Sequence, residues 1–187
     1  DSVDYQGVVL EFWHTYSEIE TEVFHSRVLP LFEEQFPAIQ IHAVRKDFTD
    51  QLKDTIHAAV ADNKQPDVMR MDMIWVPEFA KSGALVDISG LDEFNDIRHT
   101  FIGSLIQSNQ YKERYYGLPV NASTRVAIFN KHLLHEAGLS EPPRTFAELA
   151  AATVRLQSRH PDVYGVGICC SNGCGSLPYF WTFGGML

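Results

Sequence analysis

The sequence predicts an α/β protein built on a parallel β-sheet with helices on its faces. Short apolar or alternating runs occur at 7–13, 39–44 and 66–72, and each is followed by a segment whose apolar residues recur at helical spacing. Strands that alternate with helices in this way are typical of right-handed βαβ units. In such sheets, ligands bind beyond the carboxyl ends of the strands.

The first strand and the helix after it carry clear boundary signals. Residues 7–13, GVVLEFW, form an apolar run typical of a buried strand. Ser17 followed by Glu20 predicts a capping box that opens a helix. Pro30 should kink this helix, because proline has no backbone N–H to donate, and Pro37 should end it.

The next elements continue the alternation. Residues 39–44 alternate as a strand, Thr49 is the expected cap of a second helix, and 66–72 form a third, short strand. A short helix is predicted over 73–83, where Gly83 supplies the left-handed residue that commonly follows a helix.

The pattern changes in the middle of the chain. A short helix precedes a hairpin over 110–120, whose turn is expected at Lys112 to Arg114. Two further strands are predicted, over 123–130 and 163–169, because these runs are apolar and bounded by turn residues.

Two helices are expected between these last strands. Asn130 should cap the first helix, which Gly138 closes. Thr145 with Glu148 predicts a second capping box, which opens the other helix.

Charge and hydropathy argue against a nucleic-acid partner and against a membrane-spanning segment. The chain has 24 Asp and Glu against 15 Lys and Arg, a net charge of -9, so no nucleic-acid partner is expected. The cationic pair Arg45-Lys46 is interpreted as a solvated strand end. No apolar run approaches the ~20 residues that span a bilayer.

Cysteine and histidine patterns do not predict a metal site. Three cysteines lie together, and two states stay open: a small disulfide from Cys174 to Cys169 or Cys170, and three free thiols. His132 and His135 have ligand spacing on one predicted helix, but no third ligand is placed near them.

Four sequence blocks in order resemble a known family. They are LEFWHTYS, PDVMRMDMIWVPEFAKSGALVDIS, YYGLPVNASTRVAIFNKHLLHEAG and PPRTFAELAAATVRL. Together they resemble the extracellular solute-binding proteins of ABC importers, family 1, whose members mostly take up sugars and related polyols. The resemblance implies a periplasmic-binding-protein-like (type II) fold, in which two α/β lobes joined by a hinge of crossing strands trap a solute.

The resemblance also implies a domain organisation. Residues 1–118 would form the first lobe, and 119–187 the hinge crossing and the start of the second lobe. Family members continue much further, and the final run WTFGGML looks like an interrupted strand. The second lobe is therefore expected to be incomplete, as in a truncated chain or a proteolytic fragment.

Sugar recognition requires aromatic faces that stack on pyranose rings and polar side chains that satisfy buried hydroxyl groups. Four candidates follow the first strand, where the topology places a binding site; the resemblance adds candidates at the third strand, the hinge and the second lobe. Structural roles are open for several: a core position for Trp13, capping for Ser17 and Asp72, packing for Trp75, and satisfaction of strand ends for Asn121. The candidates are Trp13, His14, Tyr16, Ser17, Asp72, Trp75, Asn121 and Trp181.

The resemblance implies a carrier without catalytic chemistry or cofactor. It would bind a sugar, oligosaccharide or polyol and deliver it to the membrane permease of an ABC transporter. Its location would be periplasmic or extracellular, with a lipid anchor upstream of residue 1 as its membrane attachment. Two alternatives stay open. A hydrolase or transferase of the same layout would need a nucleophile–base pair, which the sequence does not reveal, and a non-binding fragment could dimerise through its exposed half-lobe.

Overall fold

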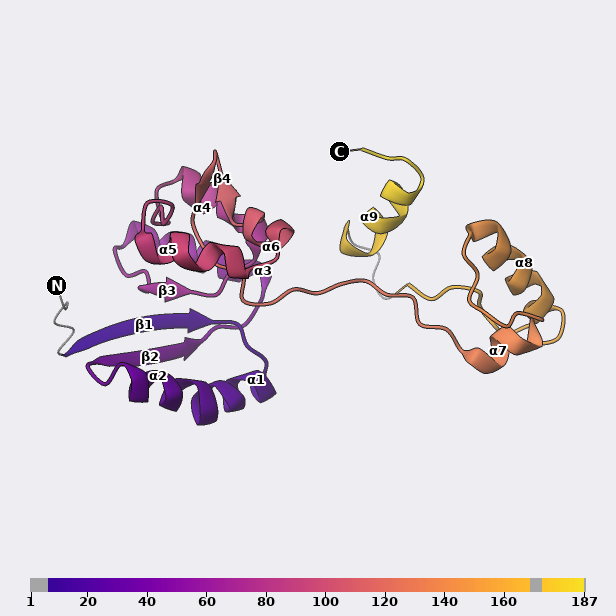
Figure 1. Cartoon of the computed structure of the whole chain (residues 1–187), viewed down its shortest axis with the longest axis horizontal. Coiled ribbons are helices and arrows are strands. Elements are labelled where there is room, and N and C mark those ends of the chain that lie inside the picture. The colour runs from indigo at the N-terminus through magenta and orange to yellow at the C-terminus, as the bar shows by residue number, and fades with distance from the viewer. Residues whose placement is uncertain (1–6, 169–172, 187) are drawn as a thin grey trace. The chain divides into compact units, whose positions relative to one another are not determined.

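The computed structural model describes residues 7–168 and 173–186. The chain divides into two compact units, Asp1–Ala122 and Ser123–Leu187 (Figure 1). Cys169 and Cys170, two members of the cysteine cluster, lie outside the described residues, as does the side chain of Cys174.

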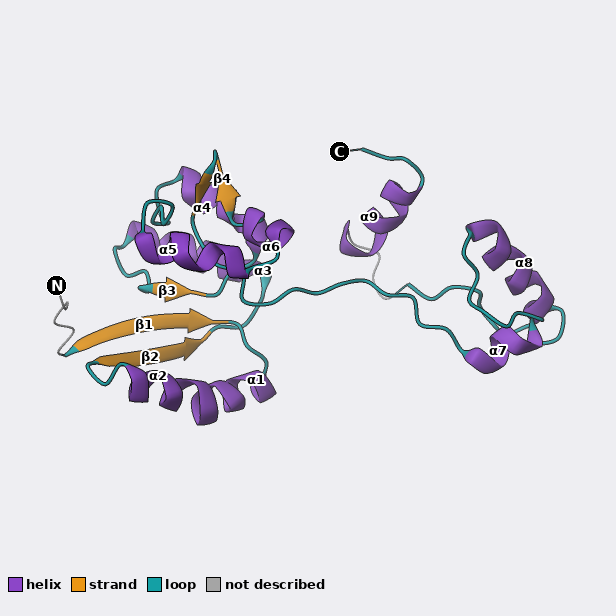
Figure 2. Ribbon diagram, in the orientation of Figure 1, coloured by secondary structure: helices purple, strands orange, loops and turns teal. Residues whose placement is uncertain are grey.

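The first unit contains the predicted parallel sheet. It has three strands in the order β2-β1-β3, and β1 is parallel to both neighbours (Figure 2). In the register, Trp13 of β1 lies between Val44 of β2 and Met69 of β3, so the carboxyl ends of all three strands lie at one edge. The strands are β1 (Val8–His14), β2 (Ile39–Arg45) and β3 (Val68–Met69).

A helical run follows β1 and lies along β1 and β2 in Figure 1. It consists of α1 (Glu18–Val23), the π-helical segment η1 (Phe24–Val28) and α2 (Leu29–Gln35). The predicted capping box is confirmed: the Ser17 N–H donates to Glu20 Oε2 at 2.8 Å, and the Glu20 N–H donates to Ser17 Oγ at 3.3 Å. The helix changes its hydrogen bonding directly before Pro30, which lies in the first turn of α2, where its missing N–H costs least.

A buried cluster forms between α3 (Asp50–Ala61) and α4 (Val76–Lys81), which follows the short 3₁₀ segment η2 (Met73–Trp75). Leu52, Ile56 and Phe79 are its fully buried members, and Phe79 is 1% exposed. Each such side chain contributes about 1.5–3 kcal/mol through burial. Thr49 occupies the N-cap position of α3, but its side chain accepts no capping hydrogen bond, so the predicted cap is wrong in that respect.

The rest of the first unit is α-helical with one hairpin. Its elements are α5 (Asp92–Ile97), η3 (Arg98–Thr100), α6 (Gly103–Gln107), β4 (Gln110–Tyr111) and β5 (Arg114–Tyr115). The hairpin is confirmed, and its turn is tighter than expected. Lys112 and Glu113 both have positive φ, of 48° and 64°, as a two-residue hairpin turn requires. The sequence patterns did not predict α5.

The second unit contains α7 (Lys131–Glu136), α8 (Phe146–Gln157) and α9 (Gly173–Thr182). The Asn130 cap is confirmed, because its Oδ1 accepts from the N–H groups of His132 and Leu133. The second capping box is only half correct. Thr145 Oγ1 accepts from the Glu148 N–H, but the Glu148 carboxylate accepts from the Arg144 N–H instead of that of Thr145.

The two strands predicted for the second unit are wrong within the described residues. Segments 123–130 and 163–168 contain no strand. Val126 is 72% and Ile128 91% exposed, so the apolar side chains that favoured a strand are not buried by the described residues of their unit. An extended run becomes a strand only when its backbone pairs with a neighbour.

The run at Trp181 and Thr182 also differs from its prediction, because both residues are helical and belong to α9 rather than to an interrupted strand. The longest helices of the described residues, α3 and α8, have 12 residues. Among the described residues, no helix has the length and apolar character needed to cross a membrane.

Candidate functional site

The carboxyl edge of the β2-β1-β3 sheet brings three strand ends together. Backbone hydrogen bonds extend the ladder beyond the strands: the Lys46 N–H donates to His14 O at 2.8 Å, and the Arg70 N–H donates to Trp13 O at 2.8 Å. Two cationic residues are therefore fixed by their backbones on either side of the end of β1. This is the edge at which parallel α/β sheets bind ligands.

Arg70 connects the parts of this edge. Its Nη1 donates to Thr15 Oγ1, and its Nη2 lies 3.5 Å from Asn121 Oδ1. Its guanidinium carbon lies 5.1 Å from the centroid of the Tyr16 ring, within range of a cation–π interaction. Arg70 was not among the residues predicted from the sequence to bind a ligand. A charged residue between Met69 and Met71 in a short apolar strand was the signal that could have found it.

His14 is fully buried at the end of β1. Its ring packs against the rings of Tyr16 and Phe24, with centroids 4.8 and 5.5 Å away. Burial lowers the pKa of His14 below its ordinary value, and electrostatic interactions with His25, Arg45 and Arg70 lower the pKa further. The imidazole is therefore neutral at pH 7. Its Nδ1 accepts from the Tyr16 N–H at 3.4 Å, and its buried Nε2 has no hydrogen-bond partner.

Trp13 and Ser17 have clear structural roles at this edge. Trp13 is 6% exposed; its indole N–H donates to Glu11 Oε1, and the ammonium of Lys46 lies 3.9 Å from the ring centroid. Ser17 is exposed and caps α1. Both residues therefore build the edge, and a contact with ligand stays a prediction for each.

Asp72 and Trp75 follow β3. The Asp72 carboxylate accepts from the Ile74 N–H at 3.1 Å and caps η2. The Trp75 ring stacks on Phe48 with centroids 5.8 Å apart and an interplanar angle of 12°. Phe48 is 62% exposed, so this aromatic pair has an accessible side.

The last two candidates belong to different units. Asn121 is exposed and joins the edge through Arg70. Trp181 lies in α9 of the second unit and is 53% exposed. The structure thus brings six of the eight candidates to the strand ends or to the residues bonded to them, with Trp75 one turn further along the chain and Trp181 in the other unit.

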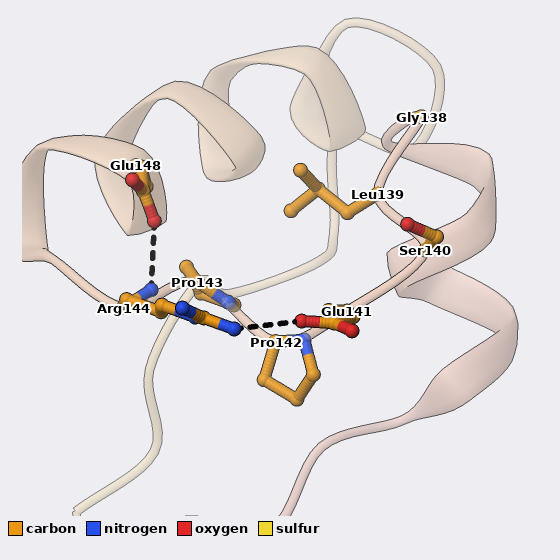
Figure 3. A pocket seen from close by; sticks show the side chains of 8 residues that line it. All are labelled: Gly138, Leu139, Ser140, Glu141, Pro142, Pro143, Arg144 and Glu148. Carbon is orange, nitrogen blue, oxygen red and sulfur yellow. Dashed lines mark hydrogen bonds and ion pairs between the residues drawn. The ribbon is translucent and has the colours of Figure 1, made fainter.

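A shallow depression of about 280 Å³ lies in the second unit between α7 and α8 (Figure 3). Its charged groups are already paired: Arg144 Nη2 lies 3.0 Å from Glu141, and the Arg144 N–H donates to the Glu148 carboxylate at 2.7 Å. None of the sequence candidates lines it. The lining residues are Gly138, Leu139, Ser140, Glu141, Pro142, Pro143, Arg144 and Glu148.

The described residues contain no group of three or more His, Cys, Asp or Glu side chains arranged to hold a metal ion. His132 lies 3.5 Å from Glu136, which also lies 2.9 Å from His160. In the first unit, the predicted side chains that could contact a ligand gather mainly at the carboxyl edge. There, guanidinium, amide and hydroxyl donors stand beside aromatic rings, a combination that suits a polar small molecule.

The fold and this edge define an α/β ligand-binding protein. Residues 17–184 match the family described as bacterial extracellular solute-binding protein, so the chain belongs to that family. This confirms the resemblance stated from the four sequence blocks, and with it the α/β fold of the periplasmic solute-binding proteins.

Individual relatives agree with this assignment. A maltotriose-binding protein of Pyrococcus abyssi is 30% identical over 159 residues, which are 82% of this chain and 32% of the relative. The sugar-binding protein MalE of Xanthomonas citri is 25% identical, with a TM-score of 0.71 over 84% of this chain and 40% of that protein. A de novo designed cysteine esterase has the same fold, with 25% identity and a TM-score of 0.74 over 88% of this chain and 40% of that protein. The chain spans about a third of the length of the curated relatives it matches.

Proposed function

We propose that the chain is part of the solute-binding component of a bacterial ABC importer. The component captures a carbohydrate or related polyol outside the cytoplasmic membrane and delivers it to the membrane permease. It performs no chemistry on the solute and needs no cofactor. Its location is the periplasm or the cell surface, and its membrane attachment is a lipid anchor.

The observation that carries the proposal is the carboxyl edge of the sheet. Tyr16 supplies an aromatic face there, and Arg70, Thr15 and Asn121 supply hydrogen-bonding groups within reach of one another. A saccharide needs this combination, because its C–H faces are apolar and each buried hydroxyl group without a partner costs about 1–3 kcal/mol. The match to the solute-binding family supports the same assignment.

Isothermal titration calorimetry with a panel of neutral ligands tests the proposal. The panel contains maltotriose, cellobiose and sorbitol, and the protein is the natural protein that contains these 187 residues. Tyr16→Ala removes the aromatic face and should weaken saccharide binding about three- to tenfold, the range expected for one aromatic contact. Tyr111→Ala is the matched control, because Tyr111 is also half-buried but lies in the β4–β5 hairpin.

A second variant separates capping from ligand binding at Asp72. Asp72→Asn keeps a side-chain oxygen that can cap η2, since Asn and Asp are equally good N-caps. It removes the carboxylate that would accept two sugar hydroxyls, so affinity should fall while thermal stability stays unchanged. Equal affinity of Tyr16→Ala and the unchanged protein would overturn the proposal. Absence of binding both to this panel and to the anionic sugars named in the next subsection would overturn it as well.

A further inference from the structure

Arg70 has no carboxylate partner at ion-pair distance among the described residues. The neighbouring cation Arg45, in contrast, lies 3.7 Å from Asp47. Glu20 is an acidic residue whose carboxyl group interacts electrostatically with Arg70. The pKa of Glu20 is lowered first by its hydrogen bonds with Ser17 and only last by the charge of Arg70, and its carboxylate is occupied by the Ser17 N–H.

The donors of Arg70 are also incompletely used. A guanidinium carries five N–H donors in a fixed planar arrangement. Nη1 bonds to Thr15, Nη2 makes only a 3.5 Å contact with Asn121 Oδ1, and the buried Nε has no hydrogen-bond partner. The two oxygen partners are neutral, so they position the guanidinium without balancing its charge.

The position of the guanidinium is fixed from two sides. Thr15 holds Nη1, and the Tyr16 ring lies 5.1 Å from the central carbon. The cation therefore needs little reorganisation to meet a ligand, which favours binding because less conformational freedom is lost. The end of β2 adds Lys46 and Arg45, which is paired with Asp47. The carboxylate of Asp72, which follows β3, caps η2.

We propose that Arg70, with Thr15 and Asn121, forms a subsite for an anionic group on the solute, either a carboxylate or a phosphate monoester. This inference rests on the proposed function, because it names the class of solute for the same edge. An anionic oxygen pair would replace the long Asn121 contact with charge-assisted hydrogen bonds, which are shorter and about twice as strong as neutral ones. A neutral hydroxyl group would leave the charge of Arg70 unbalanced.

Three ligands that differ only at one carbon test the subsite: glucose, glucuronate and glucose 6-phosphate. Calorimetry on the natural protein that contains this chain should show about tenfold tighter binding of at least one anionic ligand than of glucose at low salt. The glucuronate and phosphate titrations distinguish the two anion types. The preference should shrink as salt is added, because ions screen the contribution of an accessible charge.

Variants then assign the preference to Arg70. Arg70→Gln should abolish it, and Arg70→Lys should keep part of it, since Lys retains the charge but not the planar pair of donors. Arg114→Gln is the control of equal charge change, because Arg114 pairs with Asp87 in another part of the unit. Circular dichroism of each variant checks folding. If Arg70→Gln does not fold, two other measurements test the subsite. They are the salt dependence of anion binding by the unchanged protein and the anion preference of Arg70→Lys.

The outcomes separate this inference from the function on which it rests. Loss of the anion preference in Arg70→Gln, but not in Arg114→Gln, supports the subsite. Equal binding of glucose and both anionic ligands overturns the subsite and leaves the carrier function standing. A preference that survives in Arg70→Gln also overturns it, because another group then binds the anion. If neither the neutral panel nor the anionic ligands bind, the subsite and the proposed carrier function are both overturned.

Discussion

Acidification should destabilise the first unit through the buried imidazole of His14. The ring is fully buried and neutral in the folded protein, with its pKa lowered by burial and by nearby positive charges. In the unfolded chain the same group titrates near its ordinary value of 6.5. Below that pH the unfolded chain binds a proton that the folded protein does not, and unfolding becomes more favourable.

The size and the pH window of the effect follow from proton linkage. The contribution of His14 to stability is fully present above about pH 6.5 and is lost as the pH falls from there to the lowered folded-state pKa. One proton changes the free energy of unfolding by at most about 1.4 kcal/mol per pH unit. At pH 6.5 half of the unfolded imidazoles are already protonated, so between pH 6.5 and 5.5 His14 should remove up to about 1 kcal/mol.

Urea unfolding at several pH values measures this contribution. A Trp181→Phe background leaves Trp13 and Trp75 as fluorescent reporters, and both lie in the first unit. His14→Phe removes the titrating group but keeps an aromatic ring beside Phe24, so subtracting its pH profile isolates His14. His42→Gln, at an exposed position of β2, is the control. If His14→Phe loses stability with falling pH as steeply as the unchanged protein, the reasoning is refuted.

Three further predictions concern stability. Phe79→Ala should cost about 3–5 kcal/mol, because it empties a fully buried position; a loss below 1 kcal/mol in urea unfolding would contradict the described core. Ser17→Ala should cost about 1 kcal/mol by the same assay while Ser17→Asp stays near the original value, and equal losses would exclude capping as the cause. Gly138→Ala should cost about 1–2 kcal/mol from its φ of +76° alone, since the added Cβ meets only Arg155 Nη1 at an ordinary 3.7 Å; unchanged unfolding by Trp181 fluorescence would contradict this.

Local features could be predicted from the sequence because their causes are local. The Ser17 capping box and the Asn130 cap each involve atoms within three residues of one another, and the residue types alone specify the bonds. The strand predicted over 123–130 was wrong for the opposite reason. Apolar alternation favours an extended chain, but a strand also needs a paired neighbour and a covering layer, and a single segment's sequence encodes neither.

The carboxyl edge shows the same limit at the candidate site. Its location followed from topology, since the strand ends of a parallel sheet meet at one edge. The role of its central residue did not follow, because Arg70 contacts Thr15 and Asn121, which lie 55 and 51 residues away in the sequence. The buried state of His14 was missed similarly, because Phe24 and the neighbouring strands that enclose it come from separate elements.

The net charge of -9 and the cationic edge lead to different conclusions about partners, because they act over different distances. A nucleic acid presents many phosphates over a long surface and meets the whole acidic molecule, which disfavours binding. A small anion at Arg70 meets mainly the groups within a few ångströms, since charges beyond about 8 Å are largely screened at physiological ionic strength. Arg45 donates to the Tyr16 carbonyl at 3.0 Å and Lys46 lies over Trp13, so both remain beside the end of β1 rather than extending freely into solvent. The overall acidity therefore disfavours a polyanion but not an anionic sugar or polyol at this edge.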